Sequence, residues 1–241
     1  MKRKFTLTTA KIIIMTMIIF SFIACYSDRN KIVIQGDLHH NTYQKIYLSK
    51  ITPDGIFLID STKIHQGKFS FKIKTIDNDT CPAFYQLSLT SVNSMNTVVK
   101  RGDYLKIVAD ANGLAKSYTI EGSDDAKLMH QMDRMLTAFM DTLDILYAFY
   151  EKHIENDEIR AQVDVQYSNM LSRYSLKLIR FIRQNSNSMV SIPAFYQTFN
   201  RRRFLDEQEN LELLQLIHHD LKERYPDSEN VKFLEQRIAA F

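Results

Sequence analysis

The spacing of hydrophobic and polar residues changes once along the chain, near residue 123. Between residues 31 and 122, short apolar runs alternate with polar positions and are separated by turn residues. An alternation with a period of two is typical of the short strands of an antiparallel sandwich or barrel. Between residues 123 and 241, apolar residues recur every third or fourth position, which predicts helices. We therefore expect an α+β fold, with a β domain at 31–122 and an α-helical domain at 123–241.

The stretch 59–72 has the pattern of a β-hairpin. Phe69 and Phe71 alternate with polar residues, so both should lie on the buried face of a sheet. Gly67 follows His65 and Gln66 in the short connection, where a residue with positive φ is needed. The strand pattern thus predicts two adjacent strands joined by a tight turn.

The same stretch contains residue types of a nucleophilic triad, in Asp60, Ser61, Thr62 and His65. In a strand, however, Asp60 and Ser61 point to opposite faces, and no glycine-flanked nucleophile elbow surrounds the serine. We interpret these residues as structural, and the sequence predicts no catalytic residue.

Two long helices of about 30 and 28 residues, separated by a polar link at 155–157, predict an antiparallel helical hairpin. Ser123, followed by Asp124 and Asp125, has the composition of a helix N-terminus. The expected apolar seam of the first helix comprises Leu128, Met132, Met135, Phe139, Thr142, Leu146 and Phe149. That of the second comprises Ile159, Val163, Tyr167, Met170 or Leu171, Tyr174, Leu178 and Phe181.

Shorter helices should follow the hairpin. Ser191 is expected to cap one of them, and a second should start at 206–207. A stop and a cap at 225–228 should precede the last helix.

The first 24 residues have the pattern of a signal peptide. A basic start is followed by an apolar run at 12–22, which is too short for a membrane span of about 20 residues. The run ends at Ala24 and Cys25 in a sequence that resembles the bacterial lipobox, with Phe22 where leucine is usual. The resemblance implies cleavage after Ala24 and a lipid on Cys25, followed by a polar tether at 25–30. The alternative is an ordinary secretory signal with an accidental cysteine.

Removal of that segment changes the charge of the chain. The full sequence has 31 basic and 28 acidic residues and a net charge of +3, and residues 1–24 contain four of the basic ones. The remaining 27 basic and 28 acidic residues give a net charge of −1, which is not the balance of a nucleic-acid-binding protein. We interpret the one dense basic cluster, at 201–203, as a solvated helix end.

Cysteine and histidine usage limits redox and metal chemistry. Once Cys25 carries lipid, Cys81 is the one remaining thiol, and no Cys-x-x-Cys pair is present. Cys81 is expected to be a small buried hydrophobic residue; the alternative is an exposed thiol that a redox partner attacks. The two histidine pairs, at 39–40 and 218–219, cannot chelate by themselves because adjacent side chains diverge. We predict no metal and no cofactor.

Several short motifs occur in an order that resembles a known family. Residues 34–37, 46–48, 59–62, 67–71, 101–107 and 120–123 are similar to an uncharacterised β-rich domain of bacterial lipoproteins, and 181–188 and 225–228 are similar to its helical connector. That domain usually precedes a thioredoxin-like oxidoreductase domain, which is not seen here after Phe241. The resemblance implies that the following residues are a fold signature: Asp60, Ser61, Gly67, Phe69, Phe71, Gly102, Asp103 and Gly122.

The sequence therefore predicts a non-enzymatic lipoprotein of the cell envelope. It would be anchored through Cys25, at the outer membrane on its periplasmic or surface-exposed side, and act as a binding or scaffold module. The alternative is an accessory or split subunit of a thiol–disulfide system that partners a separate thioredoxin-like envelope protein. Neither nucleic acid nor a small-molecule substrate is expected as a ligand.

Overall fold

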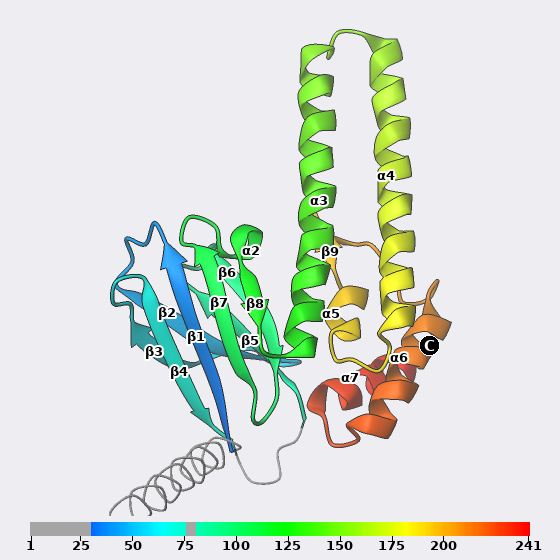
Figure 1. The fold of residues 1–241 in the computed structure, drawn as a ribbon. Helices are drawn as coiled ribbons and strands as arrows, with labels where there is room; N and C mark the ends of the chain where they lie inside the picture. The colour runs from blue at the N-terminus through cyan, green and yellow to red at the C-terminus, as the bar shows by residue number, and fades with distance from the viewer. Residues whose placement is uncertain (1–29, 76–80) are drawn as a thin grey trace, which may run out of the picture.

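A β-sandwich lies beside a helical region from which one long helical hairpin projects (Figure 1). This computed structural model describes residues 30–75 and 81–241. The N-terminal strands followed by helices confirm the α+β class. The predicted signal segment, Cys25 and all of the tether except Asn30 lie outside the described residues.

The sandwich consists of two four-stranded sheets. In the first sheet the strand order is β4 (Lys68–Lys74), β1 (Lys31–His39), β7 (Tyr104–Asp110) and β8 (Thr119–Glu121). In the second it is β3 (Gly55–Lys63), β2 (Lys45–Thr52), β5 (Ala83–Ser88) and β6 (Ser94–Val99). A short helix, α2 (Leu114–Ser117), connects β7 to β8. The inner faces of the two sheets share a core that includes Ile34, Leu48, Phe71, Leu87 and Leu105.

One strand pair departs from the expected antiparallel arrangement. β1 and β7 are parallel, with Ile34 opposite Leu105, whereas the other strand pairs described are antiparallel. A parallel pair needs a long crossover, and here the crossover contains the whole second sheet. Sequence periodicity could not show this, because it reports the faces of a strand and not the direction of its neighbour.

The predicted hairpin at 59–72 is half correct. His65 and Lys68 exchange two backbone hydrogen bonds of 2.9 Å around a tight turn, and Gly67 has φ +79°. However, β3 pairs with β2 and β4 pairs with β1, so the turn links the two sheets rather than two adjacent strands. Phe69 and Phe71 are buried as predicted, while β3 is an exposed edge strand.

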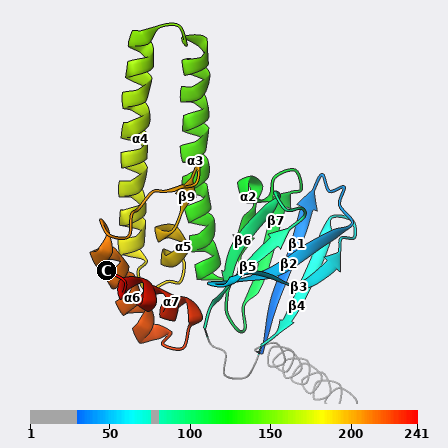
Figure 2. The same ribbon diagram turned by 180° about the vertical axis from the view of Figure 1, so that it is seen from behind.

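Two long helices form the predicted hairpin: α3 (Asp124–Lys152) and α4 (Asp157–Gln184). They are followed by α5 (Ser191–Phe195), a small hairpin of β9 (Thr198–Phe199) and β10 (Arg202–Arg203), α6 (Leu211–Arg224) and α7 (Glu229–Ile238). α5 to α7 pack around the base of the hairpin, where both views place them (Figures 1 and 2). Their core includes Leu178, Ile182, Phe195, Leu214 and Leu234.

The sandwich and the helices meet at the outer face of the second sheet. Phe84 on β5 and Val98 on β6 belong to the helical core, and α3 packs against β6. Strands β5 and β6 are therefore covered on both faces: by the opposite sheet on one side and by helices on the other. None of the helices described within residues 30–75 and 81–241 is long and apolar enough to cross a membrane.

Three local predictions in the helical region were wrong. Arg201 to Arg203 are not a helix end; they lie at the β9–β10 turn, although they are exposed as expected. Ser191 does not cap α5 but is its first residue, and its hydroxyl donates to the Ser188 carbonyl. α6 begins at Leu211 because the Asp206 carboxylate accepts the backbone N–H groups of residues 208 and 209 in a separate turn.

Candidate binding site on the helical hairpin

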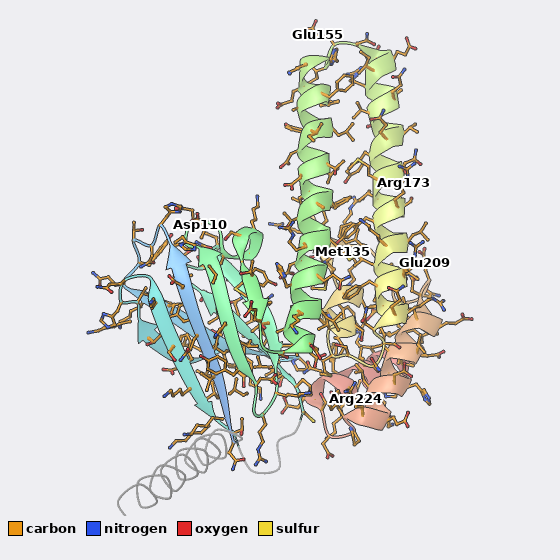
Figure 3. All side chains as sticks on the ribbon, in the orientation of Figure 1. Asp110, Met135, Glu155, Arg173, Glu209 and Arg224 are labelled. Carbon is orange, nitrogen blue, oxygen red and sulfur yellow. The ribbon has the colours of Figure 1, made fainter. Side chains whose placement is uncertain are left out.

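The outer half of the helical hairpin is the part of the described chain that stands furthest from the two cores. We call residues 141–164 the distal tip, and residues 124–140 and 165–184 the proximal part of the hairpin. In both views no other element runs alongside the upper half of α3 and α4 (Figures 1 and 2). Figure 3 shows Glu155 at the far end and Met135 and Arg173 lower on the two helices.

The turn between α3 and α4 is stabilised by residues within the turn itself. α3 ends at Lys152, and Asn156 caps α4 by accepting the backbone N–H groups of Glu158 and Ile159 at 3.1 Å each. The first turn of α4 begins with Asp157 and Glu158, which favour the positive end of the helix dipole. The hairpin can therefore reverse direction far from the cores without help from other elements.

The tip has more apolar residues than its seam can cover. Leu143 and Val163 are buried between the two helices. On the outer surface, Ile145 is 72% exposed and Phe149 is 45% exposed, and Tyr147 and Ile154 are exposed as well. The sequence placed Thr142 and Phe149 in the seam, but both are exposed, and Leu143 takes the buried position. Ile145 and Phe149, one helical turn apart, share one face of α3, and neighbouring exposed apolar side chains mark interaction sites.

A pocket of about 340 Å³ opens between the two helices at the base of the tip. Met140, Leu143 and Val163 contribute its apolar lining, and Tyr147, Tyr150 and Tyr167 add aromatic surface. Tyr147 and Tyr150 stack with their ring centroids 6.4 Å apart. Phe199 and Asn200, from the β9–β10 turn, close one side. The volume is within the usual range for ligand sites.

Negative charge surrounds this pocket. Residues 141–164 include seven acidic and two basic side chains, a net charge of −5. Asp144 and Asp164 line the pocket, one from each helix. Within residues 141–164, all of them described, the one ion pair is Arg160 with Asp157. Asp144 and Asp164 are therefore not neutralised by a basic side chain. The acidic surroundings also affect Tyr147, since a hydrogen bond to Glu151 raises the pKa of the Tyr147 hydroxyl.

A second cluster of charges, around Glu207, is structural. The buried Glu207 carboxylate accepts two hydrogen bonds from Arg237, pairs with Arg203 at 3.1 Å and accepts the Tyr196 hydroxyl at 2.8 Å. Mainly because of the Arg237 hydrogen bonds, the pKa of Glu207 falls to about 2. The same bonds join α7, which carries Arg237, to the segment between β10 and α6, which carries Glu207. Every oxygen of Glu207 is occupied by protein, so the cluster holds the fold together.

A third cluster joins the sandwich to α3. The Tyr118 hydroxyl donates to Asp133 at 2.6 Å, and the His130 ring lies 4.6 Å from the Tyr118 ring. Burial raises the pKa of Asp133 to about 6 and lowers the pKa of His130. Tyr118 itself is fully buried. The hydrogen bond and the ring contact join the sandwich, to which Tyr118 belongs, to α3.

The two signature motifs around residues 101–104 and 120–123 meet in space. The Asp103 carboxylate accepts the backbone N–H of Lys100 at 2.9 Å and a hydrogen bond from Ser123, the residue before α3. Burial raises the pKa of Asp103. Gly102 and Gly122 both have positive φ, and a Cβ on Gly122 would lie 1.8 Å from the Tyr104 carbonyl oxygen. These residues set the entry into α3.

The triad-like residues at 60–65 make local contacts. Asp60 and Ser61 are exposed on β3, and the Asp60 carboxylate accepts the backbone N–H of Ser61 itself at 2.7 Å. His65 belongs to the turn between the two sheets. The local carboxylate hydrogen bond and the tight turn account for these polar residues in structural terms.

Cys81 packs against the helical core but is half-buried, whereas the sequence predicted a buried residue. His40 interacts with Asp110 at 2.8 Å in the sandwich, while His218 is on α6, so the two histidine pairs lie in different parts of the molecule. Among residues 30–75 and 81–241, no three His, Cys, Asp or Glu side chains are grouped so that they could hold a metal ion.

Sequence reasoning missed the pocket residues Tyr147, Tyr150, Asp144 and Asp164. The available signal was the pair Tyr147 and Tyr150, two aromatic side chains three positions apart that lie outside the expected seam. No protein-family model matches the chain, and no curated protein is significantly similar to it in sequence.

Proposed function

We propose that this protein is a lipid-anchored, non-catalytic scaffold of the bacterial cell envelope that presents the distal tip of its helical hairpin to a partner protein. The observation that carries the proposal is the exposure of Ile145 and Phe149 on a part of the hairpin with no other element beside it. Ile145 leaves most of its surface in water, and the Phe149 ring contacts the ring of His153 at the exposed end of α3. Their burial against a partner would remove them from water.

The direction of the hairpin is consistent with an anchor at the N-terminus. β1 begins at Lys31 at the end of the molecule opposite the turn that joins α3 to α4 (Figure 1). A lipid on Cys25 would hold that end near the membrane and leave the distal tip pointing away from it. The lipobox-like sequence before Cys25 supports this part of the proposal.

The polar clusters support a non-catalytic role. Glu207 is occupied by two arginines and a tyrosine, and Asp133 by Tyr118. A general acid or base needs access to its substrate, and a nucleophile needs an adjacent base. The pocket on the tip has tyrosines and carboxylates without a nucleophile beside a base, a set suited to binding.

Site-specific photo-cross-linking in the native host tests the partner. A photoreactive residue at Ile145 or Phe149 should yield an adduct of one discrete mass, and the matched control at Val92, an exposed apolar residue on the sandwich, should not. The partner, once purified, should bind the full chain and lose affinity for the double variant Ile145→Ser, Phe149→Ser. The same adducts at all three positions, or unchanged affinity for the double variant, would contradict the proposal.

The anchor has its own test. Cys25→Ser should move the protein from the detergent phase to the aqueous phase on phase partition, and should abolish incorporation of a fatty-acid label. A label that persists in the variant would show that Cys25 is not the lipidated residue.

The alternative function, an accessory role in thiol–disulfide exchange, depends on access to Cys81. Its half-buried position against the helical core favours slow reaction. We expect Cys81 to react with iodoacetamide much more slowly in the folded protein than in urea. Rapid alkylation of the folded chain, with a mixed disulfide in non-reducing gels, would favour the alternative.

A further inference from the structure

We propose that the pocket at the base of the distal tip receives an arginine or lysine side chain from a basic segment of the partner protein. This inference rests on the proposed function and adds the chemistry of the partner. It draws on two independent features: the aromatic and apolar lining of the pocket, and the unneutralised carboxylates at its edge.

The lining fits the stem of a basic side chain. Lysine and arginine bury their methylene groups along apolar surface while the charged head stays in a polar environment. Met140, Leu143 and Val163 provide such a surface, and the faces of Tyr147, Tyr150 and Tyr167 attract a cation. A carboxylate-bearing or purely apolar side chain would gain less from the same walls.

The edge of the pocket fits the charged head. Asp144 on α3 and Asp164 on α4 approach the pocket from both helices, and neither forms an ion pair within residues 141–164. The net charge of −5 on the tip adds a long-range attraction for basic partners and opposes association of two tips.

A protein partner fits better than a small organic cation. Tyr147 and Tyr167, which line the pocket, are exposed and would remain largely in water after a small cation had bound. A partner segment covers the pocket and these tyrosines together, with the basic side chain as its central anchor.

Dye-labelled peptides provide the test, with the full chain in uncharged detergent and fluorescence anisotropy at about 0.15 M salt. Three nonapeptides share a glycine–serine framework and contain arginine, citrulline or glutamate at the same positions. We expect saturable binding of the arginine peptide, with the citrulline peptide at least about tenfold weaker, since citrulline keeps the shape but lacks the charge. The glutamate peptide should not bind the tip.

Matched variants locate the binding. Asp144→Asn and Asp164→Asn should each weaken the arginine peptide about threefold, and Tyr150→Leu by a similar factor. Asp141→Asn removes the same charge from an exposed position on α3 outside the pocket, and should change the affinity less than about 1.5-fold. All four variants should unfold at wild-type denaturant concentrations.

Equal losses for Asp141→Asn and Asp144→Asn would reduce the effect to general electrostatics and overturn the inference. Equal affinity for arginine and citrulline, or no saturable binding, would overturn it as well. In those cases, a discrete adduct at Ile145 would leave the proposed function standing. Conversely, the arginine peptide could bind the wild type and not Asp144→Asn, while no cross-linked adduct forms at the tip. That result would support a basic ligand in the pocket and would contradict the scaffold role.

Discussion

The proximal part and the distal tip of the hairpin belong to the same two helices but differ in surroundings and charge. The proximal part has three acidic and six basic residues, a net charge of +3, against −5 for the tip. Around the proximal part, α5, α6 and the outer face of β6 cover most of the apolar side chains, whereas Val165 and Leu176 are exposed. Around the tip, the helices cover only each other (Figures 1 and 2), except at its base, where Phe199 and Asn200 line the pocket.

The difference shows that apolar positions on the same two helices, α3 and α4, can either pack inside the fold or remain on the surface. In the proximal part, tertiary packing covers most of the seam and of the flanking apolar positions, with Val165 and Leu176 as exposed exceptions. In the tip the seam is satisfied by Leu143 and Val163, and the flanking apolar positions remain exposed. The exposed positions are therefore surplus to folding, which is why we assign them to a partner.

The largest effect is expected where tertiary packing covers a side chain, and two leucines in the proximal part of α4 test this. Leu178 is 0% exposed in the helical core, and Leu176, two positions away, is 62% exposed. Leu178→Ala should lower the free energy of unfolding by about 3 kcal/mol, because it removes buried methyl groups and leaves a cavity. Leu176→Ala should change it by less than about 0.5 kcal/mol. Urea unfolding of both variants gives the answer; similar losses would contradict the distinction.

Charged residues should also contribute more to stability when they are buried among other elements than when they are exposed on the tip. The pKa of Glu207 falls from 4.5 to about 2, so its ion pairs stabilise the fold above pH 4.5, and this stabilisation is lost as the pH falls towards 2. Glu207→Gln should lower the free energy of unfolding by about 2 kcal/mol at pH 7, because it leaves Arg237 without its carboxylate. The variant should also lose less stability than the wild type as the pH falls, because glutamine does not titrate. At the tip, Asp157→Asn breaks an exposed ion pair and should cost less than about 1 kcal/mol.

Asp133 should show the opposite pH dependence. Burial raises its pKa from 3.8 to about 6, so the folded state binds the proton more tightly than the unfolded chain. The associated stability is present below pH 3.8 and is lost as the pH rises through 6. Asp133→Asn keeps an acceptor for Tyr118 and should be more stable than the wild type by about 1–2 kcal/mol at pH 8.

Tyr118→Phe serves as the control for that experiment. It removes the donor to the charged carboxylate, so it should destabilise more at pH 8 than at pH 4. A Tyr118→Phe effect that does not depend on pH, or an Asp133→Asn variant with the wild-type pH profile, would show that Asp133 is not the titrating group.

The smallest effect is expected on the surface of the tip. Ile145→Ser should change the free energy of unfolding by less than about 0.5 kcal/mol, because the side chain is already in water. Calorimetry or urea unfolding measures this directly. A loss above about 1 kcal/mol would mean that Ile145 supports the hairpin, and would remove the main reason for a partner there.

Local features of the chain were predictable because they depend on neighbours in sequence. The lengths of α3 and α4, the positive φ of Gly67 and the burial of Phe69 and Phe71 all follow from backbone hydrogen bonding and side-chain periodicity. The predicted split of α and β regions follows for the same reason. The pocket on the tip could not be predicted, because it needs residues from α3, α4 and the β9–β10 turn together.

The sequence by itself thus determined the order and type of the long elements, the turn at Gly67 and the apolar face of β4. Only the tertiary structure decided that β3 and β4 lie in different sheets, that β1 pairs in parallel with β7, and that Phe149 is exposed while Leu178 is buried. The physical reason is the same in each case. Periodicity fixes the direction in which a side chain points from its own helix or strand, but the rest of the fold determines whether anything packs there.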